Sequence, residues 1–160
     1  MIRLLALDLA RKCGWADNVN GYECGTETLN DERDAYDFFA GMLADLKPDA
    51  VLYEDVKRHP GTMAAHKYGG YLALLRLACQ DAGGVEMIGV GVGTIKMHAT
   101  GRGNAGKNDM IMAARRIGLE PVDDNAADAA MLLDYGVKTG IIEKDTEESC
   151  CNRCHERYAT

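Results

Sequence analysis

The first segment of the chain is an apolar run that ends in an acid. Asp8 closes the run of residues 2–8 and stands between Leu7 and Leu9. The run stops at turn-like residues 11–14, a pattern that predicts a buried strand. A carboxylate beside leucines is costly to bury unless something compensates its charge, and a bound cation is one such compensator. The end of this strand is therefore a candidate cation-binding position.

The rest of the chain alternates between strand and helix patterns. Two hairpin-connected strands follow the first one, and later strands are separated by helices, which predicts one α/β domain with a mixed five-stranded sheet flanked by helices. We expect this domain to span residues 1–142 and a polar, cysteine-containing tail to span 143–160. The predicted strands are 14–19, 22–29 (joined across Asn20-Gly21), 50–53 and 85–90, and the predicted helices are 33–46, 62–81, 94–99, 107–117 and 125–137.

Two other acids occupy positions where they can join Asp8. Glu54 ends the fourth predicted strand, and Asp128 lies on a small, apolar helix, with Asp124 and Asn125 four and three residues before it. Both preceding residues can share its helix face. Magnesium prefers oxygen ligands from rigid positions, and two such ions can activate water and stabilise the leaving oxygen in phosphodiester cleavage. The three acids together predict a metal site, although each alone is more typical of a loop or a helix cap.

Charge is unevenly distributed along the sequence. The net charge is −7, which by itself argues against a nucleic-acid partner. Between Asp55 and Arg116, however, nine basic residues stand against four acidic ones, whereas the remainder has nine basic and 21 acidic residues. A basic middle can place a phosphate-binding surface beside a carboxylate cluster; a solvated surface with chance asymmetry is the alternative.

Four short motifs follow one another between Met1 and about Tyr135. They are Leu5-Ala6-Leu7-Asp8 with Cys13-Gly14-Trp15-Ala16, Tyr53-Glu54-Asp55-Val56, Thr94-Ile95-Lys96 with the segment from Gly101 to Lys107, and Asn125 to Ala130. Together they resemble the motifs of RuvC-type Holliday junction resolvases, and among these the short phage-type relatives. The resemblance implies an RNase H-like fold and a homodimer that makes paired nicks in four-way DNA junctions. It also implies magnesium as the cofactor, with manganese able to substitute.

The resemblance assigns catalytic roles to Asp8, Glu54, Asp128, Asn125 and Lys107. The family usually has an acid or histidine where Asn125 stands. An asparagine can ligate through its amide oxygen but has no charge. Either Asn125 is the fourth metal-site residue, or Asp124 replaces it from the preceding position.

Basic residues surround the second and third motifs. By the resemblance, Lys107 contacts the scissile phosphate and Lys96 the DNA backbone. Glycines near such residues let backbone amides approach phosphate closely, although solvated loop charge is the alternative. The residues expected to contact DNA are Lys57, Arg58, His59, Lys67, Lys96, Arg102 and Lys107.

Small residues recur along the long helix of residues 62–81. Glycines inside a helix lower stability by about 1 kcal/mol each relative to alanine, so close packing usually justifies them. They permit approach either to the sheet or to a twin helix in a homodimer, and the resemblance favours the dimer. The small residues are Ala64, Ala65, Gly69, Gly70 and Ala73.

The six cysteines divide into two groups. Cys13, Cys24 and Cys79 fall in predicted strands or a helix and are expected to be core thiols. In the tail, Cys150, Cys151, Cys154 and His155 offer half of a zinc site, the alternative being a free, reduced tail. The C-x-x-C-H pattern there also matches haem attachment, but that interpretation requires export, for which we see no signal, so haem is not expected.

Location and cofactors follow from what the patterns exclude. No stretch of 18 apolar residues exists, so no membrane span is expected, and the charges at Asp8 and Arg11-Lys12 argue against an export signal. We expect a cytoplasmic protein of a bacterial cell, encoded by a bacterial or phage gene. Gly101 to Asn108 nearly fits a phosphate-binding loop, but Asn108 replaces the required hydroxyl, so no nucleotide cofactor is expected.

These features predict a metal-dependent endonuclease for branched DNA. Two alternatives stay open: an RNase H-like nuclease that cuts RNA–DNA hybrids or flaps, and a catalytically weak junction-binding protein. The second follows from the missing charge at Asn125.

Overall fold

A five-stranded mixed sheet forms the centre of the protein. The computed structural model describes residues 2–142. Strand order is β3-β2-β1-β4-β5; β2 is antiparallel to β1 and β3, whereas β4 is parallel to both β1 and β5. The strands are β1 (Leu4–Asp8), β2 (Lys12–Asp17), β3 (Glu23–Thr28), β4 (Ala50–Asp55) and β5 (Glu86–Gly91).

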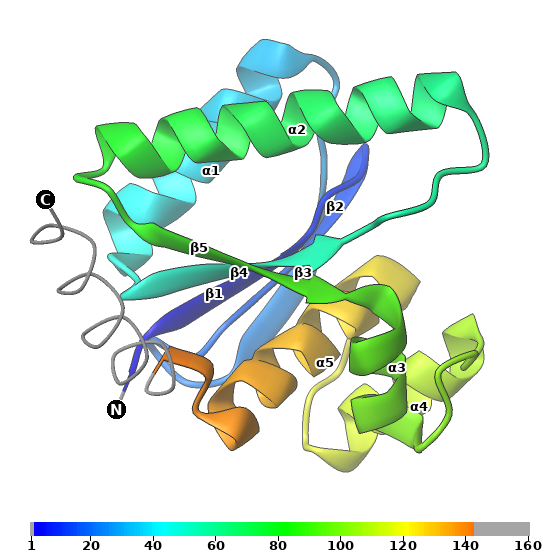
Figure 1. Ribbon diagram of the computed structural model, residues 1–160. Coiled ribbons are helices and arrows are strands. Elements are labelled where there is room, and N and C mark those ends of the chain that lie inside the picture. Colours follow the sequence, from blue (N-terminus) through cyan, green and yellow to red (C-terminus); the bar gives the residue numbers. More distant parts are fainter. Residues whose placement is uncertain (1, 143–160) are drawn as a thin grey trace, which may run out of the picture.

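Helices cover both faces of the sheet (Figure 1). One layer consists of α1 and α2, and the opposite layer of α3, α4 and α5. None of the helices described is long and apolar enough to cross a membrane. The helices are α1 (Glu32–Leu46), α2 (Thr62–Asp81), α3 (Val92–Thr100), α4 (Lys107–Arg116) and α5 (Asp124–Thr139).

The alternation of side chains along β1 divides the core in two. Leu5 and Leu7 pack in the cluster that includes α1 and α2, whereas Leu4 and Ala6 pack in the cluster that includes α5. Because successive side chains of a strand point to opposite faces, Asp8 belongs to the α5 face. The first strand therefore presents its acid to the layer formed by α3, α4 and α5.

Two glycines let α5 lie unusually close to the sheet. A Cβ atom on Gly14, in β2, would lie 2.0 Å from the carbonyl oxygen of Asn125, and one on Gly136 would lie 2.3 Å from Cδ1 of Leu52. At Gly14 the obstacle is backbone, so no Cβ atom fits and the position requires glycine, whereas at Gly136 the obstacle is the end of the Leu52 side chain, which would have to shift. The beginning and the end of α5 are thus held against the strands.

The predicted elements are all present, and α2 has the predicted bounds. The predicted hairpin across Asn20-Gly21 is present, since β2 and β3 are antiparallel. Its loop is longer than predicted, because β2 ends at Asp17 and β3 begins at Glu23. Asn18, directly after β2, bonds to the start of the chain: its side chain accepts the Leu4 backbone N–H at 2.7 Å and donates to the Ile2 carbonyl at 2.9 Å.

The three cysteines within the described residues differ in burial. Cys13 and Cys79 are buried as predicted, and Cys24 is half-buried.

The two glycines inside α2 lie on its open side. Gly69 and Gly70 are exposed, and a Cβ atom on either would meet nothing within 4 Å. These glycines therefore do not serve close packing of α2 against the sheet.

Candidate active site

Asp8 and Glu54 lie side by side at the ends of two adjacent parallel strands. The register pairs Leu7 of β1 with Tyr53 of β4, so the next residue of each strand is one of the acids. Leu52 packs in the α5-side core, and Glu54, two residues later, points to the same face. The two carboxyl groups interact, since the charge of Glu54, after burial, raises the pKa of Asp8. This pair is the base of the candidate site.

Asp128 joins the pair from the first turns of α5. Asp8 is paired in register with Gly14, and the Gly14 backbone lies against the Asn125 carbonyl. The start of α5 is therefore fixed next to the end of β1, and Asp128 follows one turn later. The Oδ1 atom of Asp128 is buried and has no hydrogen-bond partner. An unpartnered carboxylate oxygen among buried alanines needs compensation from a cation or a proton.

Burial raises the pKa values of all three acids. Burial, followed by the charges of Glu54 and Asp128, raises the pKa of Asp8 to about 8. Burial and the charge of Glu54 raise the pKa of Asp128 to about 7. Burial also raises the pKa of Glu54. A cluster with this charge binds protons near neutral pH and is well suited to exchange them for a metal ion.

Lys96 and Lys107 supply the positive charge nearest to the acids. Lys96, on α3, lowers the pKa values of both Glu54 and Asp128 through its charge. Lys107, the first residue of α4, forms an ion pair with Asp124 of α5, and this contact raises the pKa of Lys107. The two lysines named by the resemblance are thus brought together with the carboxylates.

Three polar residues at the start of α5 have different roles. Asp123 is the N-cap: its carboxylate accepts the Ala126 backbone N–H at 2.9 Å and the Thr26 hydroxyl at 2.5 Å. Despite partial burial, these hydrogen bonds lower the pKa of Asp123. Asp124 is held by Lys107, and its charge also contributes to the raised pKa of Asp8. The Asn125 side chain donates a long bond of 3.5 Å to Asp123.

The other predicted DNA contacts fall into two places. Lys57 and Arg58 are exposed in the loop that follows Glu54, and His59, in the same loop, is half-buried. Arg102 is exposed near α4 and pairs with Asp109 at 3.4 Å. Lys67 instead lines a recess beside residues 29–32, on the α1 side of the sheet. Lys67 thus lies on the face of the sheet opposite to the acids.

Two polar contacts near the site were not predicted from the sequence. Tyr68 hydrogen-bonds to the backbone on either side of Asp55, and the buried Asp134 accepts bonds from His98 at 2.7 Å and Lys138 at 2.9 Å. The spacing of Asp134 and Lys138 by four residues on one helix is a local pattern that indicates a pair. No local pattern identifies the partners of Tyr68.

The carboxylates are close together but do not form a ready-made metal shell. Within residues 2–142, no three Asp, Glu, His or Cys side chains are arranged closely enough to hold a metal ion. The chemistry of the donors nevertheless fits magnesium, because Asp8, Glu54 and the unpartnered oxygen of Asp128 are all hard oxygen ligands. The zinc prediction for Cys150, Cys151, Cys154 and His155 lies outside the described residues.

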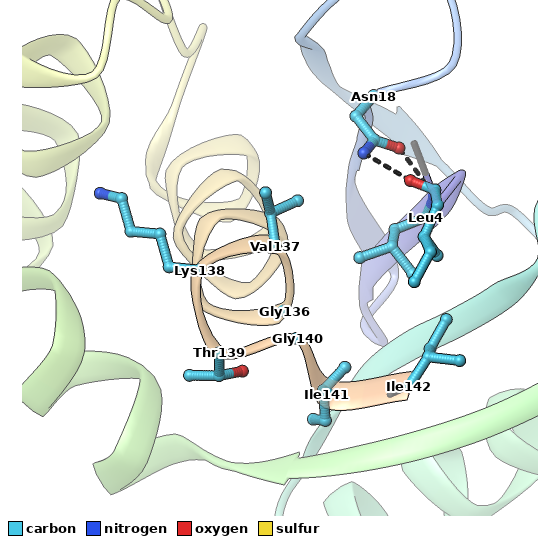
Figure 2. A pocket seen from close by; sticks show the side chains of 10 residues that line it. Leu4, Asn18, Gly136, Val137, Lys138, Thr139, Gly140, Ile141 and Ile142 are labelled. Atoms are coloured by element: carbon cyan, nitrogen blue, oxygen red, sulfur yellow. Dashed lines mark hydrogen bonds between the residues drawn. The ribbon is translucent and has the colours of Figure 1, made fainter. Parts of the chain in front are cut away.

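A recess at the opposite end of α5 has no part in this site. Figure 2 shows it between the start of β1 and the end of α5, with Leu4, Asn18 and Val137 among the residues around it. Its lining mixes apolar and polar residues and contains no carboxylate. The candidate active site therefore lies at the strand ends near Asp128, and this recess is not part of it.

The sheet order and the placement of the helices define the RNase H-like fold of the RuvC type, so the predicted fold class is confirmed. A structure of Thermus thermophilus RuvC in complex with a Holliday junction substrate matches with a TM-score of 0.72 and 19% identity, over 88% of this chain and 97% of that chain. A second structure of Thermus thermophilus RuvC matches with a TM-score of 0.66 and 20% identity, over 87% and 97% of the two chains. The yeast mitochondrial Holliday junction resolvase Ydc2 matches with a TM-score of 0.58 and 10% identity, over 82% and 76%. No family model and no curated protein matches the sequence.

Proposed function

We propose that this protein is a metal-dependent endonuclease that resolves four-way DNA junctions by paired nicks. The observation that supports this function best is the convergence of Asp8, Glu54 and Asp128, from two strand ends and a helix, on one half-buried cluster in which the charge of Glu54 raises the pKa values of the other two. The fold adds to it, because a protein with the same architecture is described in complex with a Holliday junction.

The acids are the proposed metal ligands. Asp8 and Glu54 would hold the ion from the sheet, and Asp128 would join after its side chain turns toward them. Asn125 or Asp124 would complete the set, and the ion pair of Asp124 with Lys107 favours Asn125 as the ligand. Bound magnesium supplies activation of an attacking water and stabilisation of the leaving oxygen.

Basic side chains around the acids would bind the DNA strand. Lys107 is exposed and next to Asp124, so it can exchange this partner for a phosphate. Lys96 lies near Glu54 and Asp128 and would hold the backbone of the cleaved strand. Lys57 and Arg58 would extend the contact along the loop after Glu54. Such contacts make binding depend steeply on salt, since each phosphate contact releases counterions.

We propose further that the protein is a homodimer with α2 in the interface. Met63 and Leu77 of this helix are 68% and 46% exposed, and Gly70 and Ala73 on the helix are also exposed. Open space above Gly69 and Gly70 leaves room for a second helix. A two-fold dimer matches the two-fold symmetry of a four-way junction, and sedimentation of the protein without DNA measures the stoichiometry.

The decisive experiment offers three substrates with magnesium or with chelator: a four-way junction, a flap and an RNA–DNA hybrid. We expect paired nicks in the junction only, and only with magnesium. Asp8→Asn and Asp128→Asn should abolish cleavage while junction binding survives. Asp45→Asn, an exposed acid on α1, is the matched control and should cleave normally.

Other outcomes of this experiment would replace the proposal. Cutting of the hybrid or flap in preference to the junction would indicate a different RNase H-like nuclease. Binding of the junction without cleavage would indicate a junction-binding protein. Normal cleavage by Asp8→Asn would disprove the assignment of the metal site.

A further inference from the structure

Tyr68 connects α2 to the backbone of Glu54. Its hydroxyl donates a hydrogen bond to the Glu54 carbonyl at 2.8 Å and accepts one from the Val56 N–H at 3.3 Å. The pairing of β4 with β1 ends at Tyr53, whereas its pairing with β5 continues through Glu54 and Asp55. The Tyr68 hydroxyl therefore bonds to the Glu54 backbone beyond the end of the β1 ladder and adds to the support that β5 gives this strand end.

The ring of Tyr68 holds the same loop at a second point. The His59 ring packs on it, with ring centroids 4.9 Å apart and an interplanar angle of 44°. Val56 and His59 are therefore both fixed to Tyr68, whereas Lys57 and Arg58 between them are exposed. A loop anchored on both sides of two basic residues directs them outward in a defined conformation.

We propose that Tyr68 is a positioning residue that sets the Glu54 carboxylate for metal binding and presents Lys57 and Arg58 to DNA. This inference rests on the proposed nuclease function. The direction of a side chain follows from its backbone, so a shift of the Glu54 carbonyl moves its carboxylate away from Asp8. Sites of this kind need their ligands held within a fraction of an ångström, and surrounding hydrogen bonds provide that precision.

Two substitutions separate the hydroxyl from the ring. Tyr68→Phe removes both hydrogen bonds and keeps the ring contact with His59. Tyr68→Leu removes both hydrogen bonds and the ring contact, and keeps an apolar side chain at this position. Tyr36→Phe is the matched control, because Tyr36 also loses a hydroxyl hydrogen bond, the 2.6 Å bond to Asp81 at the far end of α2. Three quantities are measured for each: calorimetric binding of Mn²⁺ to the protein alone, junction affinity in chelator, and single-turnover cleavage.

For Tyr68→Phe we expect Mn²⁺ binding and cleavage to weaken by about fivefold, the typical worth of one net hydrogen bond. Its junction affinity should stay within about twofold of wild type, since the His59 contact is kept. Tyr68→Leu should also lose roughly threefold or more in junction affinity, because Lys57 and Arg58 lose their anchored loop. Tyr36→Phe should match wild type in all three measurements.

Melting curves of all variants establish the temperature at which each is folded, and the measurements are made below it. Wild-type Mn²⁺ affinity and cleavage in Tyr68→Phe would overturn the inference while leaving the proposed function intact. The same loss in Tyr36→Phe as in Tyr68→Phe would also overturn it, since the effect would then be general. Wild-type protein that neither binds Mn²⁺ nor cuts the junction would overturn the proposed function and this inference with it.

Discussion

Replacing Asp8 by asparagine should make the metal-free protein more stable at alkaline pH, because the wild-type carboxylate is held in an unfavourable place. The pKa of Asp8 is raised to about 8 by burial and by Glu54 and Asp128. A raised pKa means that the folded state binds the proton more tightly than the unfolded state. The contribution of the Asp8 proton to the stability of the fold is then fully present below about pH 4 and is lost as pH rises through the pKa of the folded state. Asparagine does not ionise, so the variant does not lose this stability as pH rises.

The size of the effect follows from the shift. From the ordinary value of 3.8 to about 8 is roughly four pKa units, and each unit corresponds to about 1.4 kcal/mol, which sets an upper limit of about 6 kcal/mol. Glu54 and Asp128 can take up protons in place of Asp8, so we expect a difference on the order of 2 kcal/mol at pH 9. For a chain of this size that corresponds to roughly 4–8 °C in Tm.

The assay compares thermal unfolding of wild type, Asp8→Asn and Asp45→Asn in chelator at pH 5 and pH 9. Any pH-independent effect of the new amide cancels when the Tm difference at pH 5 is subtracted from that at pH 9. We expect the difference for Asp8→Asn to grow with pH and that for Asp45→Asn to stay constant. An equal Tm difference at both pH values for Asp8→Asn would refute the argument that Asp8 is electrostatically destabilised in the folded protein.

Three further substitutions test how the site is built. Gly14→Ala places a Cβ atom 2.0 Å from the Asn125 carbonyl oxygen, so it should lower the unfolding free energy by about 1–3 kcal/mol and lower the affinity for Mn²⁺. Gly41→Ala is the control, because its Cβ atom meets nothing within 4 Å; it should leave Mn²⁺ affinity unchanged and leave stability unchanged or raise it. Lys107→Met should leave Tm unchanged, because this side chain is 79% exposed, but should reduce the salt slope of junction binding by about one and slow cleavage at least tenfold; an unchanged slope would exclude a phosphate contact. Asp134→Asn weakens the bond to His98 that joins α5 to α3, and calorimetric melting should show a loss of about 1–3 kcal/mol in unfolding free energy; no loss would mean that the contact does not stabilise this packing.

Local patterns in the sequence determined most of the elements. The bounds of α2 follow from its start after Pro60-Gly61 and its end before Gly83-Gly84, both of which are local features. The placement of Asp8 and Glu54 at strand ends was predictable for the same reason, since an apolar run that stops at an acid is visible in a few residues. The motif order then predicted the fold, which the structure confirms.

The tertiary structure decided which polar residues meet. Asp123, Asp124 and Asn125 are adjacent in sequence, yet one caps a helix, one pairs with Lys107 and one lies over Gly14. Their separate roles depend on how α4 and β2 approach the start of α5. Such approaches are set by strand order and register between segments far apart along the chain, and residue spacing within one segment has no information about them.

Tyr68 illustrates the same limit, because its hydrogen bonds reach residues 12 and 14 positions earlier. By itself, then, the sequence determined the strands, the helices and the acids at positions 8, 54 and 128. Only the folded chain decided that these acids share a half-buried cluster with Lys96 nearby, and that Lys67 lies on the other side of the sheet. The physical reason is that burial and charge coupling arise between surfaces, and those surfaces exist only after the helices pack on the sheet.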